Sequence, residues 1–98
     1  MTYYAKKVDD NQSDIVKVLT KVGCFVMDLS GSGRGVMDIL VFRGKRMWAV
    51  EIKDGSKKPS AQCLTPAQIV MHAKVAAAGG EIHIVRSVDE ALALVTNK

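Results

Sequence analysis

Two apolar segments joined by a short polar one constrain the fold of this chain most strongly. Val36–Phe42 and Met47–Ile52 are rich in β-branched and aromatic residues, which is typical of β-strands. Between them, Gly44-Lys45 suits a two-residue type II′ turn, in which glycine takes the first position. The pattern therefore predicts a β-hairpin in which Arg43 faces Arg46.

This register brings together three charged side chains near the open end of the hairpin. Counting back from the turn, Asp38 faces Glu51, and Lys53 shares the face of Glu51 because side chains alternate along a strand. The two carboxylates would lie about 5 Å apart, and like charges in that position destabilise a sheet. A cation between them would relieve the repulsion, so the pattern predicts a divalent metal site.

The chemistry of these residues points to phosphodiester hydrolysis. Carboxylate oxygens prefer hard cations such as Mg²⁺ or Mn²⁺, and the backbone carbonyl of Ile52 is a third candidate ligand after Asp38 and Glu51. Such a metal polarises a phosphoryl oxygen and lowers the pKa of a bound water. Lys53 is placed to orient that water or to stabilise the charge that develops on phosphate.

The remaining elements predict an α/β fold with a mixed central sheet flanked by helices. The Thr65-Pro66-Ala67-Gln68 sequence combines an N-cap, a first-turn proline and a capping box, and predicts a helix start. Apolar spacing and glycine stops give the element order αβββαβα. The expected segments are a helix over 9–22, strands over 24–29, 36–42 and 47–52, a helix over 65–78, a strand over 81–86 and a helix over 88–95.

Size and composition favour one folded domain over residues 1–98. Hydrophobic residues make up 48% of the chain, and no apolar run approaches the roughly 18 residues of a membrane span. The first residues lack the apolar stretch of a secretory signal, so a cytoplasmic location is expected. Cys24 and Cys63 lack zinc-site spacing and are expected to be free, buried structural residues.

The charge distribution favours a polyanionic partner, with nucleic acid as the leading candidate. Of the formal net charge of +4, the excess lies in residues 31–60, which hold seven basic and three acidic residues. Arg34, in a glycine-rich loop, and Lys57 and Lys58 are candidate contacts to the DNA backbone. The alternatives are a plain connector for the loop and a solvated surface for the lysines. The GxGxG pattern is followed by a strand, which argues against a nucleotide-binding loop.

These motifs, in this order, resemble the VRR-Nuc family of the PD-(D/E)XK nuclease superfamily, in particular its stand-alone phage and bacterial members. Asp38 followed by Glu51-Ile52-Lys53 is similar to the D…(D/E)xK signature. The flanking Gly35–Asp38, Trp48–Lys53 and Leu64–Gln68 segments are similar to local features of the family, over roughly residues 9–96.

The resemblance implies a restriction-endonuclease-like αβββαβ core and Mg²⁺- or Mn²⁺-dependent cleavage of DNA. Asp38 and Glu51 would be the metal ligands, and Lys53 and Gln68 would complete the catalytic set. A capping role is the competing interpretation of Gln68, and the two roles are compatible. Many relatives carry an acidic residue, often Glu, in the first helix. This helix offers Gln12 and Asp14 but no Glu, and their contribution stays open. Stand-alone members resemble Holliday-junction resolvases, which implies a homodimer acting on branched DNA in a bacterial or phage-infected cell. The alternatives are a non-cleaving nucleic-acid-binding module and a flap- or nick-directed nuclease.

Two further residues have structural readings. His72 lies one helical turn after Gln68, and a structural role is favoured over a catalytic one. Trp48 points away from Glu51 under the period-two rule, which favours packing in the core or at an interface.

Overall fold

The fold follows the predicted element order, with one additional short helix. The computed structural model describes residues 11–97, and the structural statements below concern that range. A 3₁₀ turn in the polar loop after the hairpin was not predicted. The elements are α1 Gln12–Lys21, β1 Phe25–Asp28, β2 Ile39–Arg43, β3 Arg46–Ile52, η1 Pro59–Gln62, α2 Pro66–Ala77, β4 Ile82–Val85 and α3 Val88–Thr96.

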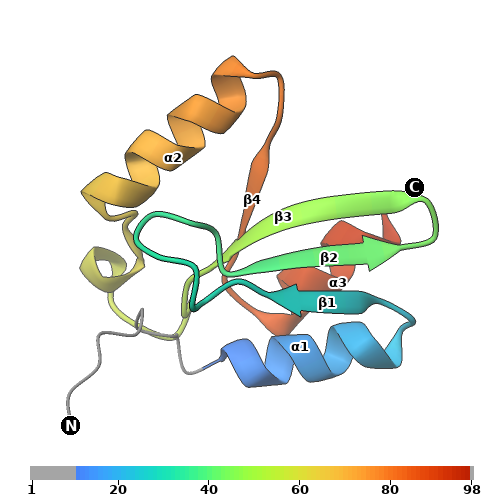
Figure 1. The fold of residues 1–98 in the computed structure, drawn as a ribbon. Coiled ribbons are helices and arrows are strands. Elements are labelled where there is room, and N and C mark those ends of the chain that lie inside the picture. The colour runs from blue at the N-terminus through green and yellow to red at the C-terminus, as the bar shows by residue number, and fades with distance from the viewer. Residues whose placement is uncertain (1–10, 98) are drawn as a thin grey trace, which may run out of the picture.

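The four strands form one mixed sheet in the order β1-β2-β3-β4 (Figure 1). β1, β2 and β3 are antiparallel neighbours, and β4 pairs parallel to β3. Arg43 pairs with Arg46 and Ile39 with Val50, which confirms the predicted register. Gly44 has a φ of 63°, and no described non-glycine residue has a positive φ, as a type II′ turn requires.

The hydrophobic core lies on the side of the sheet covered by α1 and α3. Ile15 and Leu19 of α1 and Val95 of α3 pack there against alternate residues of β2 and β3. Trp48 belongs to this core and is 5% exposed, so its predicted direction away from Glu51 is confirmed. α2 lies on the opposite side and rises away from the sheet beside β4 (Figure 1). The site described below lies between α2 and the end of β3.

Some boundaries differ from the prediction for a physical reason. β2 begins at Ile39 rather than Val36, because its pairing with β3 loses the regular register at Asp38. The backbone N–H of Asp38 donates to Val50 O (3.1 Å), its backbone carbonyl accepts from Leu29 N (2.8 Å), and its Oδ2 accepts from Ile52 N (2.7 Å). Cys24 and Cys63 are both free, but Cys63 is exposed, so its predicted burial is wrong.

The basic residues of the hairpin turn lie at the opposite end of β3 from Glu51. The Arg43 guanidinium donates to the carbonyls of Val22 (3.1 Å) and Val95 (3.4 Å), and the Arg46 guanidinium donates to the carbonyl of Asn97. These carbonyls end α1 and α3, where the helix dipole favours a cation. Part of the excess positive charge of residues 31–60 therefore has this structural role, and the rest lies toward the opposite end of the sheet.

Candidate active site

Three charged side chains are buried together where the hairpin strands end. Asp38 immediately precedes β2, Glu51 is the penultimate residue of β3, and Lys53 directly follows β3. They are 3%, 0% and 7% exposed. Because Val50 faces the core, alternation along β3 turns Glu51 toward the other side of the sheet, where α2 lies. Asp38 reaches the same end of β3 through its Oδ2, which accepts from Ile52 N. Charged groups are rarely buried so completely unless they are paired or bind a ligand.

Gln68 on α2 connects the lysine to the glutamate. Lys53 Nζ donates to Gln68 Oε1 (2.9 Å), and Gln68 Nε2 donates to Glu51 Oε2 (3.1 Å). The same Oε1 accepts from the backbone N–H of Thr65 (2.9 Å), and Thr65 Oγ1 accepts from Gln68 N (3.2 Å), which completes the capping box. The two predicted roles of Gln68 therefore coexist in one side chain, and the helix cap fixes the direction of its amide.

His72 contacts the second oxygen of Glu51, a contact that its position in the sequence only hinted at. Its Nε2 lies 3.4 Å from Glu51 Oε1, and its side chain is 17% exposed. Burial, with a smaller contribution from the charge of Lys53, holds the pKa of His72 below its usual value, so the neutral ring is favoured. A neutral ring with its proton on Nε2 donates to Glu51. Both oxygens of the carboxylate are thus held from consecutive turns of α2.

The start of α1 is tied to the end of β3, and sequence reasoning missed this link. Asn11 Nδ2 donates to the carbonyls of Lys53 and Arg86, each at 3.2 Å. The next residue, Gln12, is 4% exposed, and its Oε1 has no hydrogen-bond partner within the described range. Asp14, the other first-helix candidate, is exposed. Of the two first-helix candidates, Gln12 is therefore the buried one, with an unsatisfied side-chain oxygen.

Replacing Gln12 with methionine tests whether this side chain holds a ligand of the cation or only packs in the core. An unsatisfied buried polar group costs about 1–3 kcal/mol, so Gln12→Met is expected to raise Tm in EDTA by about 4–8 °C. If Gln12 holds a ligand of the cation, Mn²⁺ binding weakens by about tenfold in the same variant. Thermal unfolding and calorimetric Mn²⁺ titration measure the two effects, with Asp14→Asn as the control that changes neither. Unchanged Mn²⁺ affinity in Gln12→Met would assign Gln12 to packing alone.

The donor set suits a hard divalent cation. Asp38 and Glu51 offer carboxylate oxygens next to the Ile39–Val50 pair that ends the hairpin, and the backbone carbonyl of Ile52 lies between the motif residues. No group of three or more His, Cys, Asp or Glu side chains able to share a metal occurs in residues 11–97. Zinc sites need more such ligands. Mg²⁺, in contrast, keeps several waters and is bound through one or two carboxylates.

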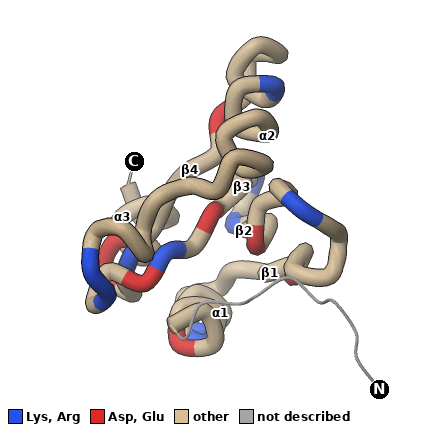
Figure 2. The backbone as a smooth tube through the Cα atoms, turned by 90° about the vertical axis from the view of Figure 1, so that its left-hand side faces the viewer, with Lys and Arg blue, Asp and Glu red and all other residues tan. Residues whose placement is uncertain are grey.

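The predicted DNA-contacting residues lie in loops at the same end of the sheet as Lys53. Arg34 and Lys58 are exposed, and Lys57 is half-buried. The loop of Arg34 is anchored by its neighbour Gly35, whose Cα approaches α2 so closely that an added Cβ would lie 2.6 Å from the carbonyl oxygen of Ala67. Figure 2 shows basic and acidic residues interspersed along the backbone.

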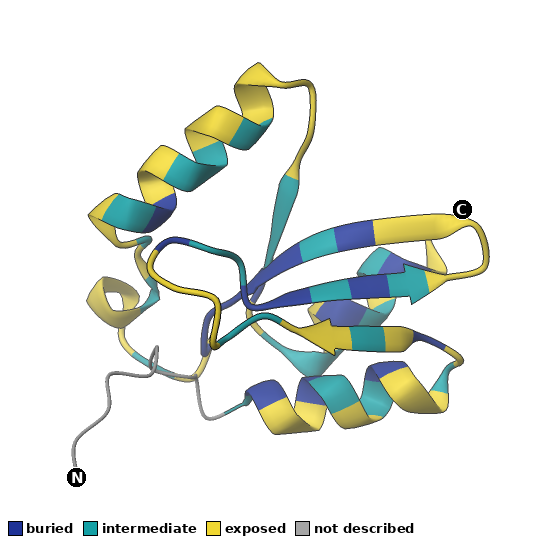
Figure 3. Cartoon of the chain, in the orientation of Figure 1, coloured by how far each residue is buried: buried dark blue, intermediate teal, exposed yellow. Residues whose placement is uncertain are grey.

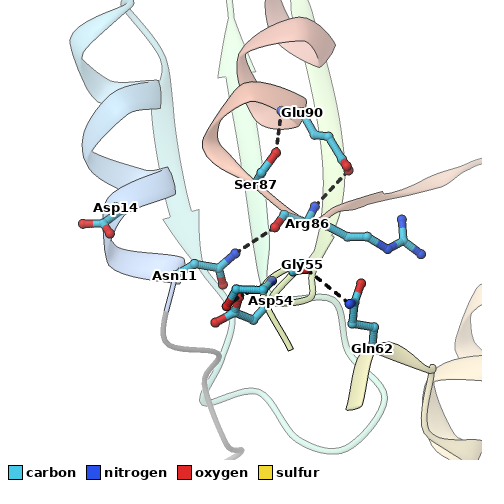
Figure 4. Close-up of a pocket in the computed structure, with 9 residues that line it drawn as sticks. Asn11, Asp14, Asp54, Gly55, Gln62, Arg86, Ser87 and Glu90 are labelled. Carbon is cyan, nitrogen blue, oxygen red and sulfur yellow. Dashed lines mark hydrogen bonds between the residues drawn. The ribbon is translucent and has the colours of Figure 1, made fainter. Parts of the chain in front are cut away.

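A separate hollow lies away from these residues. It has a volume of about 640 Å³ and lies between the starts of α1 and α3 and the loop after β3 (Figure 4). Hydrogen bonds from the Ser56 hydroxyl and backbone N–H, at 2.6 and 2.9 Å, hold the pKa of Asp54 below its usual range. Glu90 accepts from Arg86 N at 3.0 Å. The polar groups of this hollow mainly join loops to helix ends.

The fold and the site define a restriction-endonuclease-like α/β domain with a carboxylate pair and a lysine at the end of the central hairpin. Comparison with protein-family models and with curated proteins gave no match. A solved structure described as a VRR_NUC domain is similar, with a TM-score of 0.65 and 26% sequence identity. The similarity covers 91% of this chain and 98% of that one.

This similarity supports membership of the VRR-Nuc family, which the motifs predicted. The match extends over nearly all of both chains, so it includes the elements that carry Asp38, Glu51, Lys53 and Gln68. In the part of the chain that the structure describes, no helix has the length and apolar character needed to cross a membrane.

Proposed function

We propose that this nuclease domain is a Mg²⁺- or Mn²⁺-dependent endodeoxyribonuclease that selects branched DNA and resembles Holliday-junction resolvases. The observation that carries the proposal is the burial of Asp38, Glu51 and Lys53 around one end of the hairpin. A module that only binds DNA has no need for buried carboxylates at a surface that receives phosphates, because they repel the ligand.

Each residue then has a defined task. Asp38, Glu51 and the carbonyl of Ile52 would hold the cation, which supplies Lewis-acid polarisation and a water of lowered pKa. Lys53 donates to the scissile phosphate and stabilises its developing negative charge, while Gln68 holds the ammonium at the required position. Hydrolysis adds the water oxygen to phosphorus and releases the 3′-oxygen. Arg34, Lys57 and Lys58 bind backbone phosphates without reading bases.

Resolution of a four-way junction requires two paired nicks, whereas this chain carries one candidate site. A homodimer supplies the second site, and its two-fold symmetry matches that of a junction. The proposed active species is therefore a homodimer.

The substrate panel that tests this proposal contains four-way, flapped, nicked and linear DNA, each with Mg²⁺, Mn²⁺ or EDTA. Paired symmetric cuts in the four-way DNA are expected with either metal, and no cleavage is expected in EDTA. Cleavage products are mapped at nucleotide resolution. Preferential cutting of flaps or nicks would replace the resolvase assignment. Tight binding without cleavage under any metal would favour a binding module. Cleavage preserved in Asp38→Ala would place the active site elsewhere.

A further inference from the structure

α2 is an apolar helix that the rest of the domain leaves largely uncovered. Lys74 is its only charged residue, and Gln68 is its only buried one among the described residues. Ile69 and Val70 are 55% and 54% exposed (Figure 3). A helix that is apolar on all sides is expected inside a protein, and an isolated helix of this length is marginal in water. α2 therefore needs a further apolar surface.

The side of the sheet that faces α2 presents such a surface. Phe25, Met27 and Met47 are 62%, 42% and 59% exposed. Register places their side chains in two adjacent rows across β1, β2 and β3, which are Phe25-Phe42-Met47 and Met27-Leu40-Ala49. The ring centroids of Phe25 and Phe42 lie 6.1 Å apart. The rows contain no charged residue, and α2 stands beside β4 instead of over them (Figure 1).

We propose that a second copy of this chain covers both surfaces, with α2 of each protomer packed on the β1–β2–β3 face of the other. The inference rests on the homodimer of the proposed function and assigns its interface. A two-fold contact requires a self-complementary patch, and each chain offers a helix that lacks a sheet together with a sheet face that lacks a helix. The absence of charge from the two rows allows an apolar helix to dock there without burying an unpaired ion.

The size of the two surfaces suits a dimer. All five strongly exposed large hydrophobic side chains within residues 11–97 belong to these two surfaces. Divided over two separate surfaces, these side chains together present on the order of 500 Å², comparable with the largest single apolar patch of a typical monomer. A standard interface buries about 800 Å² per partner, and the half-buried Leu40, Phe42 and Ala49 extend the patch toward that area.

The interface would also support the active site. Gln68 and His72 reach Glu51 from α2, so the position of this helix determines both contacts to the glutamate. A partner sheet packed against the exposed side of α2 holds the helix against its own β3. The dimer is thus expected to bind Mn²⁺ more tightly than the separated protomer.

The test places opposite charges on the two surfaces. Sedimentation velocity without DNA or metal is expected to show a dimer for the wild type. Met47→Glu on the sheet and Val70→Lys on α2 are each expected to raise the dimer dissociation constant about thirtyfold or more. A mixture of the two variants is expected to restore the dimer, because the altered helix of one then faces the altered sheet of the other. Ala93→Glu, at an exposed position of α3, is the control that leaves the dimer intact.

Far-ultraviolet circular dichroism of each variant shows that loss of the dimer is not loss of the fold. A monomeric wild type, a dimer that survives both substitutions, or folded monomeric variants that fail to pair when mixed would each overturn the interface. The mixing step separates helix-on-sheet packing from contact between two α2 helices, which it would not restore. An inactive wild type that passes the mixing test would refute the nuclease proposal and leave the interface standing, whereas an active monomer would refute the interface alone.

Discussion

Replacing Glu51 with glutamine is expected to reduce DNA cleavage by at least about a thousandfold. The substitution preserves size and removes the charge of a side chain that is 0% exposed. Because Asp38 and Glu51 lie next to the last β2–β3 pair, Ile39 with Val50, loss of one carboxylate is also expected to reduce repulsion in the absence of metal. Tm in EDTA should therefore rise, while the increase in Tm caused by Mn²⁺ should disappear. Single-turnover cleavage rates and thermal unfolding with and without Mn²⁺ measure these changes.

Glu81→Gln provides the matched control for the glutamate substitution. Its side chain is 75% exposed and lies just before β4, so neither the cleavage rate nor the Mn²⁺-dependent Tm increase should change. A Glu51→Gln enzyme that cleaves within tenfold of the wild-type rate would show that this carboxylate is not part of the chemistry. An equal Mn²⁺ effect on both proteins would show that the cation binds elsewhere.

Gly35→Ala is expected to lower the free energy of unfolding by about 3 kcal/mol and to reduce cleavage strongly. Gly35 has a φ of 81°, and an added Cβ would meet the carbonyl oxygen of Ala67 at 2.6 Å. Real Cβ atoms do not approach backbone oxygen so closely, so the loop and the start of α2 must separate. This movement displaces both Asp38, three residues further on, and Gln68. Urea unfolding and cleavage kinetics of the variant test the prediction.

Gly33→Ala isolates the contact from the backbone conformation. Gly33 also has a positive φ, 114°, but nothing lies within 4 Å of its added Cβ. Its substitution should cost about 1 kcal/mol from backbone strain alone, with little loss of cleavage. Equal destabilisation by the two substitutions would mean that the approach of Gly35 to Ala67 does not support the site.

The parts of the site that were predicted from the sequence depend on short-range rules. A two-residue turn with glycine first determines the hairpin register, which brings Asp38 and Glu51 next to the last strand pair, Ile39 with Val50. The capping box likewise depends on residues three positions apart, Thr65 and Gln68. In both cases local geometry leaves few alternatives, so composition and spacing are sufficient.

The parts that were missed depend on contacts between distant segments. His72 was placed on the face of Gln68, but only the packing of α2 against β3 shows that it reaches Glu51. Asn11 binds two carbonyls that lie 42 and 75 residues away in the chain. Arg43 was counted among the basic residues expected to favour a nucleic-acid partner, although its guanidinium donates hydrogen bonds to carbonyls at helix ends. No spacing rule within one segment reports such partners.

The tight turn between β2 and β3 also has a consequence for the order in which the molecule forms. Contact order favours early pairing of these two strands, because only two residues separate them. Gln68 and His72 arrive later, with the crossover that brings β4 parallel to β3. During synthesis and refolding the nascent hairpin must therefore form while its two acids still repel each other, and the donors that steady the glutamate come into place only when the crossover closes.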